Sequence, residues 1–459
     1  MQQVISENKM GVQPVGTLLT NMAIPMMISM LVQAFYNIVD SVFVSRISEH
    51  ALTAVSLAFP LQTLCIAVGS GTAVGMNAIL SRSLGEKRQD LVDKSANTGI
   101  FLFLCSYVVF ALIGVFLVKP FFLAQTDVEE ILRHGIAYSS ICLTASIGIF
   151  MQFCFERLLQ STGRTSLAMV TQVVGAVTNI ILDPILIFGL FGLPRMEVAG
   201  AALATVIGQV LAAVLALIMN LKKNPEVHIR AGMIRFDAGI AAEIYRVGLP
   251  SIIMQSIGSV MTFCMNKILI GFTTTATAVF GAYFKLQSFV FMPIFGLNNA
   301  MVPIIAYNYG AAKPDRVKRT IQLSIGTAMC IMCVGLLAFE AFPAVLLSLF
   351  DASEQMLQIG VPALRIIGFH FVLAGFCIPA GSVCQAIGNP MHSLITSVCR
   401  QLLVLLPVAW LLSLTGRLEL VWLAFPAAEV VSVTLSAIFL WKTIKKANAS
   451  MLNRQQMQR

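Results

Sequence analysis

Apolar tracts of about twenty residues follow one another along almost the whole 459-residue chain, with only short polar breaks between them. A helix needs about 20 mostly apolar residues to cross the hydrocarbon core of a bilayer. Charged residues make up 11% of this chain, whereas soluble globular chains carry about 25%. A water-soluble enzyme is therefore excluded. An outer-membrane barrel would instead alternate polar and apolar residues in short steps, so the sequence predicts an all-α integral membrane protein.

Breaks at charged, Gly and Pro clusters divide the tracts into twelve predicted transmembrane helices. They lie near residues 15–44, 52–80, 95–118, 131–156, 165–190, 197–221, 240–270, 278–306, 320–348, 355–386, 391–414 and 418–441. With twelve spans both termini share one side of the membrane, and most of the 30 Lys and Arg residues fall in the loops of that side. Cytoplasmic loops carry an excess of Lys and Arg, so both termini are predicted to be cytoplasmic. Because the basic residues form no stripe, the net charge of +9 does not indicate nucleic-acid binding.

Over residues 25–163, the first half of the chain matches the second half at a constant offset of 225 residues, without a gap. Matched pairs include Pro25 with Pro250, Gln62 with Gln287, Gly71 with Gly296, Asp90 with Asp315, and Gly163 with Gly388. Composition does not easily explain Pro, Gly, Gln and Asp matches at a single offset. The sequence predicts two six-helix lobes, residues 1–222 and 240–459, joined by a cytoplasmic linker at 223–239. An even number of spans in each lobe gives a parallel repeat, and we expect the substrate path to lie between the lobes.

Two of the predicted spans in the first lobe carry carboxylates at membrane depth. Polar residues recur on one face of span one at spacings of three and four: Gln33, Tyr36, Asn37 and Asp40. In span five, Asn179 and Asp183 stand four residues apart and also share a face. Ionisable groups inside a membrane cost at least ~2.5 kcal/mol on insertion scales and mark ion or substrate pathways. Both aspartates fall in the outer halves of their helices, so the two carboxylates can approach each other at similar depth.

Such a pair has two possible coupling ions. Two nearby carboxylates in a low-dielectric interior do not both ionise easily, so the pair can carry a proton. Alternatively Na⁺ sits among oxygens of Asp40, Asn179, Asp183 and the span-six hydroxyl of Thr205, because hard cations take oxygen ligands. A third reading is that Asp40 lies near the outer surface and simply caps or hydrates a helix end.

Prolines and chamber residues complete the first-lobe candidates. Pro25 and Pro184 each remove a backbone donor and are hinge candidates, since they can kink their helices. Glu156 lies beside Arg157 near the inner end of span four. Its carboxylate either attracts a cationic substrate or pairs locally.

The second lobe lacks the carboxylate pair, because the repeat aligns Asp40 with Met265 and Asp183 with Val408. Its intramembrane polar residues are mostly basic or neutral: Lys267, Lys285, Arg365 and His370. The substrate-chamber candidates are Gln33, Tyr36, Asn37, Glu156, Met265 and Lys267. Lys267 either pairs across the cleft or extends to a membrane surface. Glu429 of span twelve has Arg400 of span eleven as a possible partner.

Other motifs favour packing over chemistry. Gly71 and Gly75 form a GxxxG motif, which in a long bundle usually marks close helix contact within the chain. The five His residues are dispersed, and no HExxH, GxSxG or Walker A motif occurs. No cofactor site and no enzyme activity are predicted.

These residues resemble the multidrug and toxic compound extrusion (MATE) family of transporters over roughly residues 10–445, and most closely the bacterial branch that includes the DinF and MepA pumps. The segments that carry the resemblance are SRSLGEKR at 81–88, QSTGRT at 160–165, NIILDPILIFG at 179–189, VAGAALATVIGQ at 198–209 and PIIAYNYGAAKPDR at 303–316. The Asn-x-x-x-Asp-Pro segment is the most specific of them.

The resemblance implies two six-helix lobes around a central cleft in a bacterial cytoplasmic membrane. It implies a secondary active antiporter that exports small organic cations in exchange for Na⁺ or H⁺ by alternating access. Separately, we expect the protein to be a monomer. Carried over by residue, the cation site comprises Asp40, Asn179 and Asp183, together with Thr205. The rival function is a lipid-linked oligosaccharide flippase of the same wider superfamily, for which Lys267, Lys285 and Arg365 provide basic residues.

Overall fold

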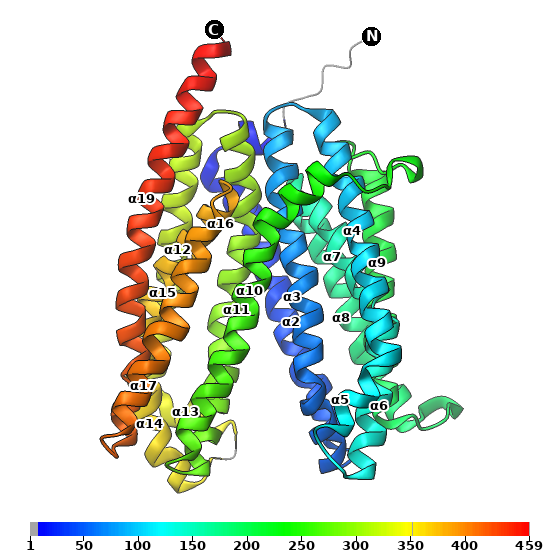
Figure 1. Cartoon of the computed structure of the whole chain (residues 1–459), viewed down its shortest axis with the longest axis vertical. Helices are drawn as coiled ribbons and strands as arrows, with labels where there is room; N and C mark the ends of the chain where they lie inside the picture. The colour runs from blue at the N-terminus through cyan, green and yellow to red at the C-terminus, as the bar shows by residue number, and fades with distance from the viewer. Residues whose placement is uncertain (1–7, 351, 459) are drawn as a thin grey trace. The chain divides into compact units, whose positions relative to one another are not determined.

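The computed structural model describes residues 8–350 and 352–458, and these residues form helices joined by short turns (Figure 1). The helices up to the linker are α1 Lys9–Val12, α2 Val15–Ser45, α3 Glu49–Gly85, α4 Gln89–Phe116, α5 Val118–Leu123, α6 Glu129–Thr144, α7 Ile147–Ser161, α8 Thr165–Phe188, η1 Leu190–Gly192, α9 Glu197–Lys223 and η2 Ala231–Met233. The later ones are α10 Ala238–Ile270, α11 Thr274–Gly310, α12 Pro314–Ala341, α13 Pro343–Ser348, α14 Glu354–Gly368, α15 His370–Ala386, α16 Pro390–Val398, η3 Cys399–Leu405, α17 Leu406–Ser413, α18 Leu418–Val421 and α19 Ala424–Gln458.

The number of spans agrees with the prediction. Within the described part of the chain, ten helices are long and apolar enough to cross a membrane. Two bent pairs, α6 with α7 and α14 with α15, raise the number to twelve if each pair is one span. The pairs bend by 42° and 46°, and they fall in the predicted spans 131–156 and 355–386. The predicted twelve-helix, all-α membrane fold is therefore confirmed.

Several matching helices in the two halves of the repeat have the same boundaries. Helices α3, α4 and α5 begin and end at the positions that the repeat aligns with the ends of α11, α12 and α13, respectively. The turn after α3 has Lys87 at φ 58°, and the matching turn after α11 has Ala312 at φ 54°. Two halves with the same pattern of apolar tracts and breaks thus form the same local structure.

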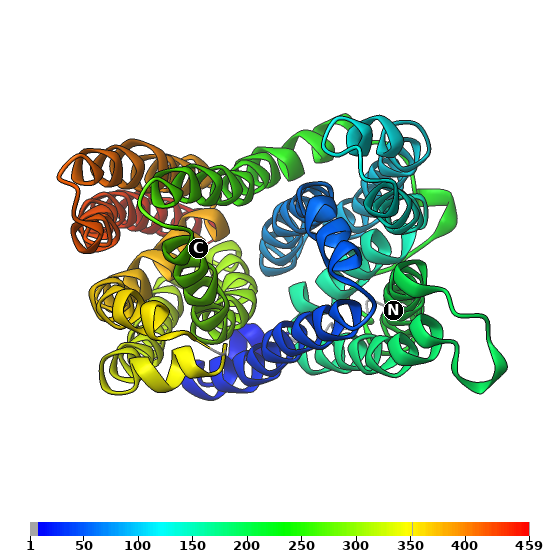
Figure 2. The same cartoon turned by 90° about the horizontal axis from the view of Figure 1, so that it is seen from below.

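The chain divides into two compact units, and the division falls inside helices. One unit comprises Ile28–Ile252 and is called the first-repeat unit; the second-repeat unit comprises the chain before Ile28 and after Ile252. The chain thus passes between the units within α2 and within α10, in each case shortly after a proline, Pro25 or Pro250. The sequence places the division in the linker at 223–239 instead. Figure 2 looks along the helices and shows those of each unit running side by side.

Glycines allow two close helix contacts, one between α3 and α10 and the other between α11 and α2. Gly71 and Gly75 of α3 lie against α10, where the backbone of Gly248 and Ile244 leaves no room for a side chain. At the matching position, a Cβ on Gly296 of α11 would lie 2.6 Å from the backbone of Met27 in α2. The GxxxG motif therefore packs within the chain, as the sequence predicts.

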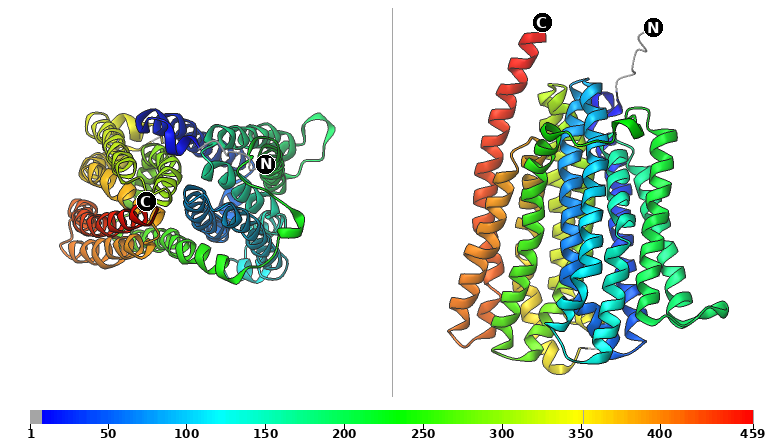
Figure 3. Two further views of the ribbon diagram at one scale, coloured as in Figure 1. Left: turned by 90° about the horizontal axis from the view of Figure 1, so that it is seen from above. Right: turned by 45° about the vertical axis from the view of Figure 1, so that its right-hand side comes forward.

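Both ends of the described chain bind the turn between α11 and α12. Asn308 and Arg316 donate hydrogen bonds to the backbone oxygen of Met10, each at 3.0 Å. At the other end of the chain, Arg454 Nη2 donates to the backbone oxygen of Tyr309 at 2.9 Å. Figure 3 shows the last helix, α19, extending beyond its neighbours. The two ends thus lie at the same end of the second-repeat unit, as an even number of spans requires.

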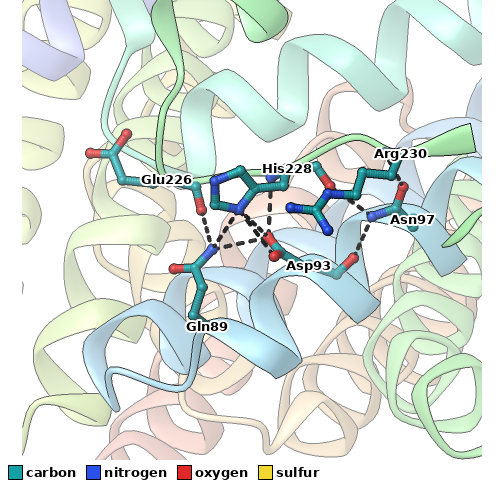
Figure 4. A network of polar contacts seen from close by, with 6 residues as sticks. All are labelled: Gln89, Asp93, Asn97, Glu226, His228 and Arg230. Atoms are coloured by element: carbon teal, nitrogen blue, oxygen red, sulfur yellow. Dashed lines mark hydrogen bonds and ion pairs between the residues drawn. The ribbon is translucent and has the colours of Figure 1, made fainter. Parts of the chain in front are cut away.

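The linker before α10 is bound to one face of α4 (Figure 4). Gln89, Asp93 and Asn97 stand four residues apart, so their side chains share that face. Gln89 Nε2 donates to the backbone oxygen of Glu226 at 2.9 Å, and Asp93 Oδ2 lies 3.0 Å from His228 Nδ1. Asn97 makes two bonds to the linker backbone: its Nδ2 donates to the oxygen of His228 at 2.9 Å, and its Oδ1 accepts from the N–H of Arg230 at 3.1 Å.

We expect Asn97→Ala to release this linker locally. The change removes two hydrogen bonds, each of which contributes about 0.5–1.5 kcal/mol, so amide exchange at 228–230 should accelerate about tenfold. Hydrogen–deuterium exchange with mass spectrometry measures this effect. Lys94→Ala, at an exposed position of the same helix, serves as the control. Unchanged exchange at 228–230 in Asn97→Ala would show that other contacts hold the linker.

Candidate functional site

The two aspartates of the first lobe come together within the first-repeat unit. Asp40 of α2 and Asp183 of α8 lie within hydrogen-bonding reach of each other through their carboxyl groups. Asp183 has no exposed surface, and Asp40 Oδ1 is covered by protein and has no hydrogen-bond partner within the described residues. A hydrogen bond between two carboxyl groups needs a proton on one of them, so this geometry suits a pair that shares a proton.

Asn179 and Thr205 extend the same site. Asn179 lies one turn before Asp183 on α8, and α8 packs against α9, which carries Thr205. With the amide oriented by its neighbours, Asn179 Nδ2 donates to Asp183 Oδ2 at 3.2 Å, and Asn179 Oδ1 accepts from the backbone N–H of Thr205 at 3.1 Å. The structure thus brings all four predicted cation-site residues together.

Oxygen atoms dominate this site. The described residues include no group of three or more His, Cys, Asp or Glu side chains that could hold a metal ion. The oxygens present for a Na⁺ ion are the carboxylates of Asp40 and Asp183 with the Asn179 amide and Thr205 hydroxyl oxygens, and oxygens are the ligands that hard cations prefer. The unpartnered Oδ1 of Asp40 offers one such ligand.

Three polar residues that the sequence analysis did not assign to the site also lie around the pair. Tyr138 and Cys142 of α6 are close enough to Asp40 to interact electrostatically with its carboxyl group. Gln62 Nε2 of α3 donates a hydrogen bond to the Tyr138 hydroxyl at 2.8 Å. The available signal was that Gln62 and Tyr138 are polar residues inside predicted spans. Helical spacing groups residues only within one helix, so it does not connect them to Asp40.

The polar face of α2 divides between buried and exposed positions. Tyr36 is half-buried and close to both carboxyl groups, whereas Gln33 and Asn37 are exposed. The hinge candidates both lie inside helices, Pro25 in α2 and Pro184 in α8. Pro184 follows Asp183 directly, so the missing backbone donor is next to the carboxylate pair.

Glu156 forms a separate buried centre in the same unit. Its carboxylate accepts hydrogen bonds from Gln172 Nε2 at 2.6 Å, Gln152 Nε2 at 2.9 Å and Thr171 Oγ1 at 3.1 Å. Of the two alternatives for Glu156, this arrangement favours local pairing, because three donors already satisfy the carboxylate.

The second-repeat candidates are placed differently from one another. Met265 is completely buried, whereas Lys267 is exposed, with its Nζ 5.8 Å from the centre of the Phe263 ring. Lys285 Nζ lies 5.9 Å from the Phe350 ring centre. Arg365 is paired with Glu340 at 3.9 Å. Of these two chamber candidates, Lys267 is therefore accessible to a substrate and Met265 is not.

A protein-family model described as MatE matches the chain twice, over residues 25–185 and 250–411. This chain belongs to the MatE family. The two matches begin at Pro25 and Pro250, which the internal repeat aligns with each other. Members of the family are transporters rather than enzymes.

Two curated relatives cover nearly all of this MatE protein. An FAD transporter of Shewanella oneidensis is 25% identical over 91% of this chain and 92% of its own length. The multidrug export protein MepA of Staphylococcus saprophyticus is 27% identical over 87% of this chain and 88% of its own length. The resemblance to the MepA-like branch is thereby confirmed.

A solved structure shows the same fold. It is described as an outward-facing conformation of a multidrug resistance MATE family transporter of the MOP superfamily. It matches with a TM-score of 0.92 and 24% identity, covering 98% of this chain and 100% of that chain. This MatE protein is thus a multi-pass membrane transporter with the family fold.

Proposed function

We propose that this MatE protein is a secondary active multidrug efflux antiporter that exports cationic organic compounds in exchange for Na⁺ or H⁺. The observation that carries the proposal is the pairing of half-buried Asp40 with fully buried Asp183, together with Asn179 and Thr205. Carboxylates at membrane depth are costly and occur on ion pathways. The name of the MepA relative, a multidrug export protein, supports the substrate class.

The carboxylate pair couples drug export to ion import, because the organic cation and the H⁺ or Na⁺ compete for the same negative charge. An empty, ionised pair attracts an organic cation and equally attracts H⁺ or Na⁺. A bound proton or Na⁺ neutralises part of the charge and weakens the attraction for the drug, which favours release. Since a ligand shifts a conformational equilibrium only by its differential affinity, ion and drug drive alternating access when they stabilise different states. Pro25 and Pro184 provide the points at which helices of the site can bend.

The location follows from the same proposal. We place the protein in the bacterial cytoplasmic membrane with both termini in the cytoplasm, because the basic loops lie on that side. The drug enters from the cytoplasmic side and leaves on the outer side. The transporter acts as a monomer and needs no cofactor besides the coupling ion.

The test is transport by purified protein in liposomes under separately imposed gradients. We expect efflux of a fluorescent organic cation to accelerate when either an inward Na⁺ gradient or an inward H⁺ gradient is applied. The gradient that drives transport identifies the coupling ion. Antiport would be contradicted if neither gradient raised efflux above the rate without a gradient and above the rate in liposomes that lack the protein.

An anionic cargo is the second candidate function. The FAD transporter among the relatives favours it, as do the exposed basic side chains of Lys267 and Lys285. A flippase for lipid-linked oligosaccharides would use the same basic residues for its headgroup. Adding FAD or an anionic lipid-linked glycan to the liposome assay distinguishes these cargoes, because an anion-specific carrier leaves the fluorescent cation inside.

A further inference from the structure

The second-repeat unit contains a buried ion pair outside the site described above. Arg400 Nη1 donates to Glu429 Oε2 at 3.2 Å, which confirms the partner predicted for Glu429 from the sequence. Glu429 is only 3% exposed, whereas the Arg400 side chain is 28% exposed. The arginine is thus the part of the pair that solvent can reach.

The buried carboxylate is only half satisfied. Glu429 Oε1 is covered and has no hydrogen-bond partner within the described residues, and the same is true of His370 Nδ1. The other ring nitrogen, His370 Nε2, lies 3.3 Å from the Tyr283 hydroxyl. An ionised carboxylate away from water normally needs donors for both oxygens. Among the described residues, Arg400 and the Cys377 thiol, which is a weak donor, hydrogen-bond the carboxylate, and Oε1 stays without a donor.

Glu156 provides the contrast within the same protein. It is equally buried, with 3% exposed, but its carboxylate accepts three hydrogen bonds from amide and hydroxyl donors. The protein can therefore surround a buried glutamate at membrane depth with several neutral donors. Glu429 lacks that arrangement, and a proton on Oε1 would remove the negative charge that this oxygen otherwise carries without a donor.

The position of the pair in the repeat supports a functional role. The repeat aligns the segment α16–η3–α17 with α8 from its first residue to its last, and the segment packs against α19 as α8 packs against α9. Arg400 and Glu429 thus stand on the counterparts of the helices that carry Asp183 and Thr205. Arg400 also lies in the π-helical turn η3, and π-helical turns inside α-helices occur frequently at functional sites.

We infer that Glu429 is a second proton-binding site of this transporter, gated by Arg400. The inference rests on the proposed antiport but uses different residues. The proton forms a bond to Oε1 and leaves the hydrogen bond from Arg400 to Oε2 in place. The titratable and charged groups that face Glu429 are Arg400 from η3, His370 and Cys377 from α15, and Tyr283 from α11.

Protonation changes the net charge of the pair from zero to plus one. The uncompensated charge then lies on Arg400, which is the partly exposed member. A positive charge at this point disfavours a nearby cation. Proton binding at Glu429 therefore adds to the release of cationic cargo through the second-repeat unit.

Infrared difference spectroscopy on the purified protein tests the protonation directly. Acidification of the wild type should produce a carboxylic acid C=O band that is lost in Glu429→Gln and retained in Glu419→Gln, an exposed glutamate of the same unit. A spectrum in which Glu429→Gln and the wild type show identical acid bands would overturn the proposal. This readout needs no transport, so it separates failure of this site from failure of the proposed antiport.

A double variant decides the matter if Glu429→Gln alone does not fold. Arg400→Gln with Glu429→Gln removes both charges and leaves no unpaired ion. If the pair is only structural, the folded double variant should transport with the pH dependence of the wild type, and that result would overturn the inference. If Glu429 binds a proton, the double variant should fold, but its transport should depend less on pH than that of the wild type. The pH dependence that remains is the share contributed by Asp40 and Asp183.

Discussion

Efflux driven by an ion gradient should be abolished in Asp183→Asn. The amide introduced there would keep an oxygen that can accept from Asn179 Nδ2, which donates to Asp183 Oδ2 at 3.2 Å, so we expect the fold to survive. An amide neither ionises nor binds a proton near neutral pH, so the coupling step is lost. Two assays measure the effect: growth in the presence of a toxic organic cation, and efflux from liposomes. In both, we expect Asp183→Asn to perform no better than a sample without the transporter.

Asp40→Asn should have the same effect, because both carboxyl groups are needed for the pair. Asp127→Asn, at an exposed loop position, is the matched control and should transport as the wild type does. Expression and thermal unfolding in detergent establish that each variant is folded. If both Asp40→Asn and Asp183→Asn retain gradient-driven efflux, the pair is not the coupling site and the assignment fails.

The second large effect is expected at Gly75, where one methyl group should prevent correct folding. A Cβ on Gly75 would overlap the backbone carbonyl of Ile244 in α10, and a backbone atom in a helix cannot move aside independently. Overpacking typically costs about 1–3 kcal/mol and occasionally more. Because the overlap here is with backbone, we expect Gly75→Ala to lose about 3 kcal/mol or more. The yield of monodisperse protein and the thermal midpoint in detergent measure the loss.

Gly326→Ala in α12 is the control with the opposite expectation. A Cβ at that position meets no atom within 4 Å, and Ala is favoured over Gly inside a helix by about 1 kcal/mol. We therefore expect the control to be as stable as the wild type or slightly more so. Equal stability of Gly75→Ala and Gly326→Ala would show that α3 and α10 separate readily at this contact.

The repeat and the helices could be read from the sequence because they depend on local order along the chain. Tract length sets the number of spans, and a single constant offset predicts that α11 repeats α3 and α12 repeats α4. The spacing of Asn179 and Asp183 likewise places both side chains on one face of α8. These features need only helical geometry and the length required to cross a bilayer.

Contacts between helices could not be read in the same way. Gln62 and Tyr138 hydrogen-bond across α3 and α6, and Glu156 finds donors on α7 and α8. The division of the chain inside α2 and α10, rather than in the linker, also depends on packing between elements far apart in sequence. The sequence contained the residues for each of these features, but no pattern within one helix linked them.

The order of apolar and polar residues by itself determined that this chain spans a membrane twelve times in two repeated halves and carries carboxylates at membrane depth. The sequence also offered Asp40 with Asp183, and Arg400 with Glu429, as possible pairs, but only the tertiary structure showed that the members of each pair meet. It also decided which buried carboxylates are satisfied and which are not. The physical reason is that span formation depends on the transfer of one segment into lipid, whereas electrostatic pairing depends on distances of a few ångström between helices.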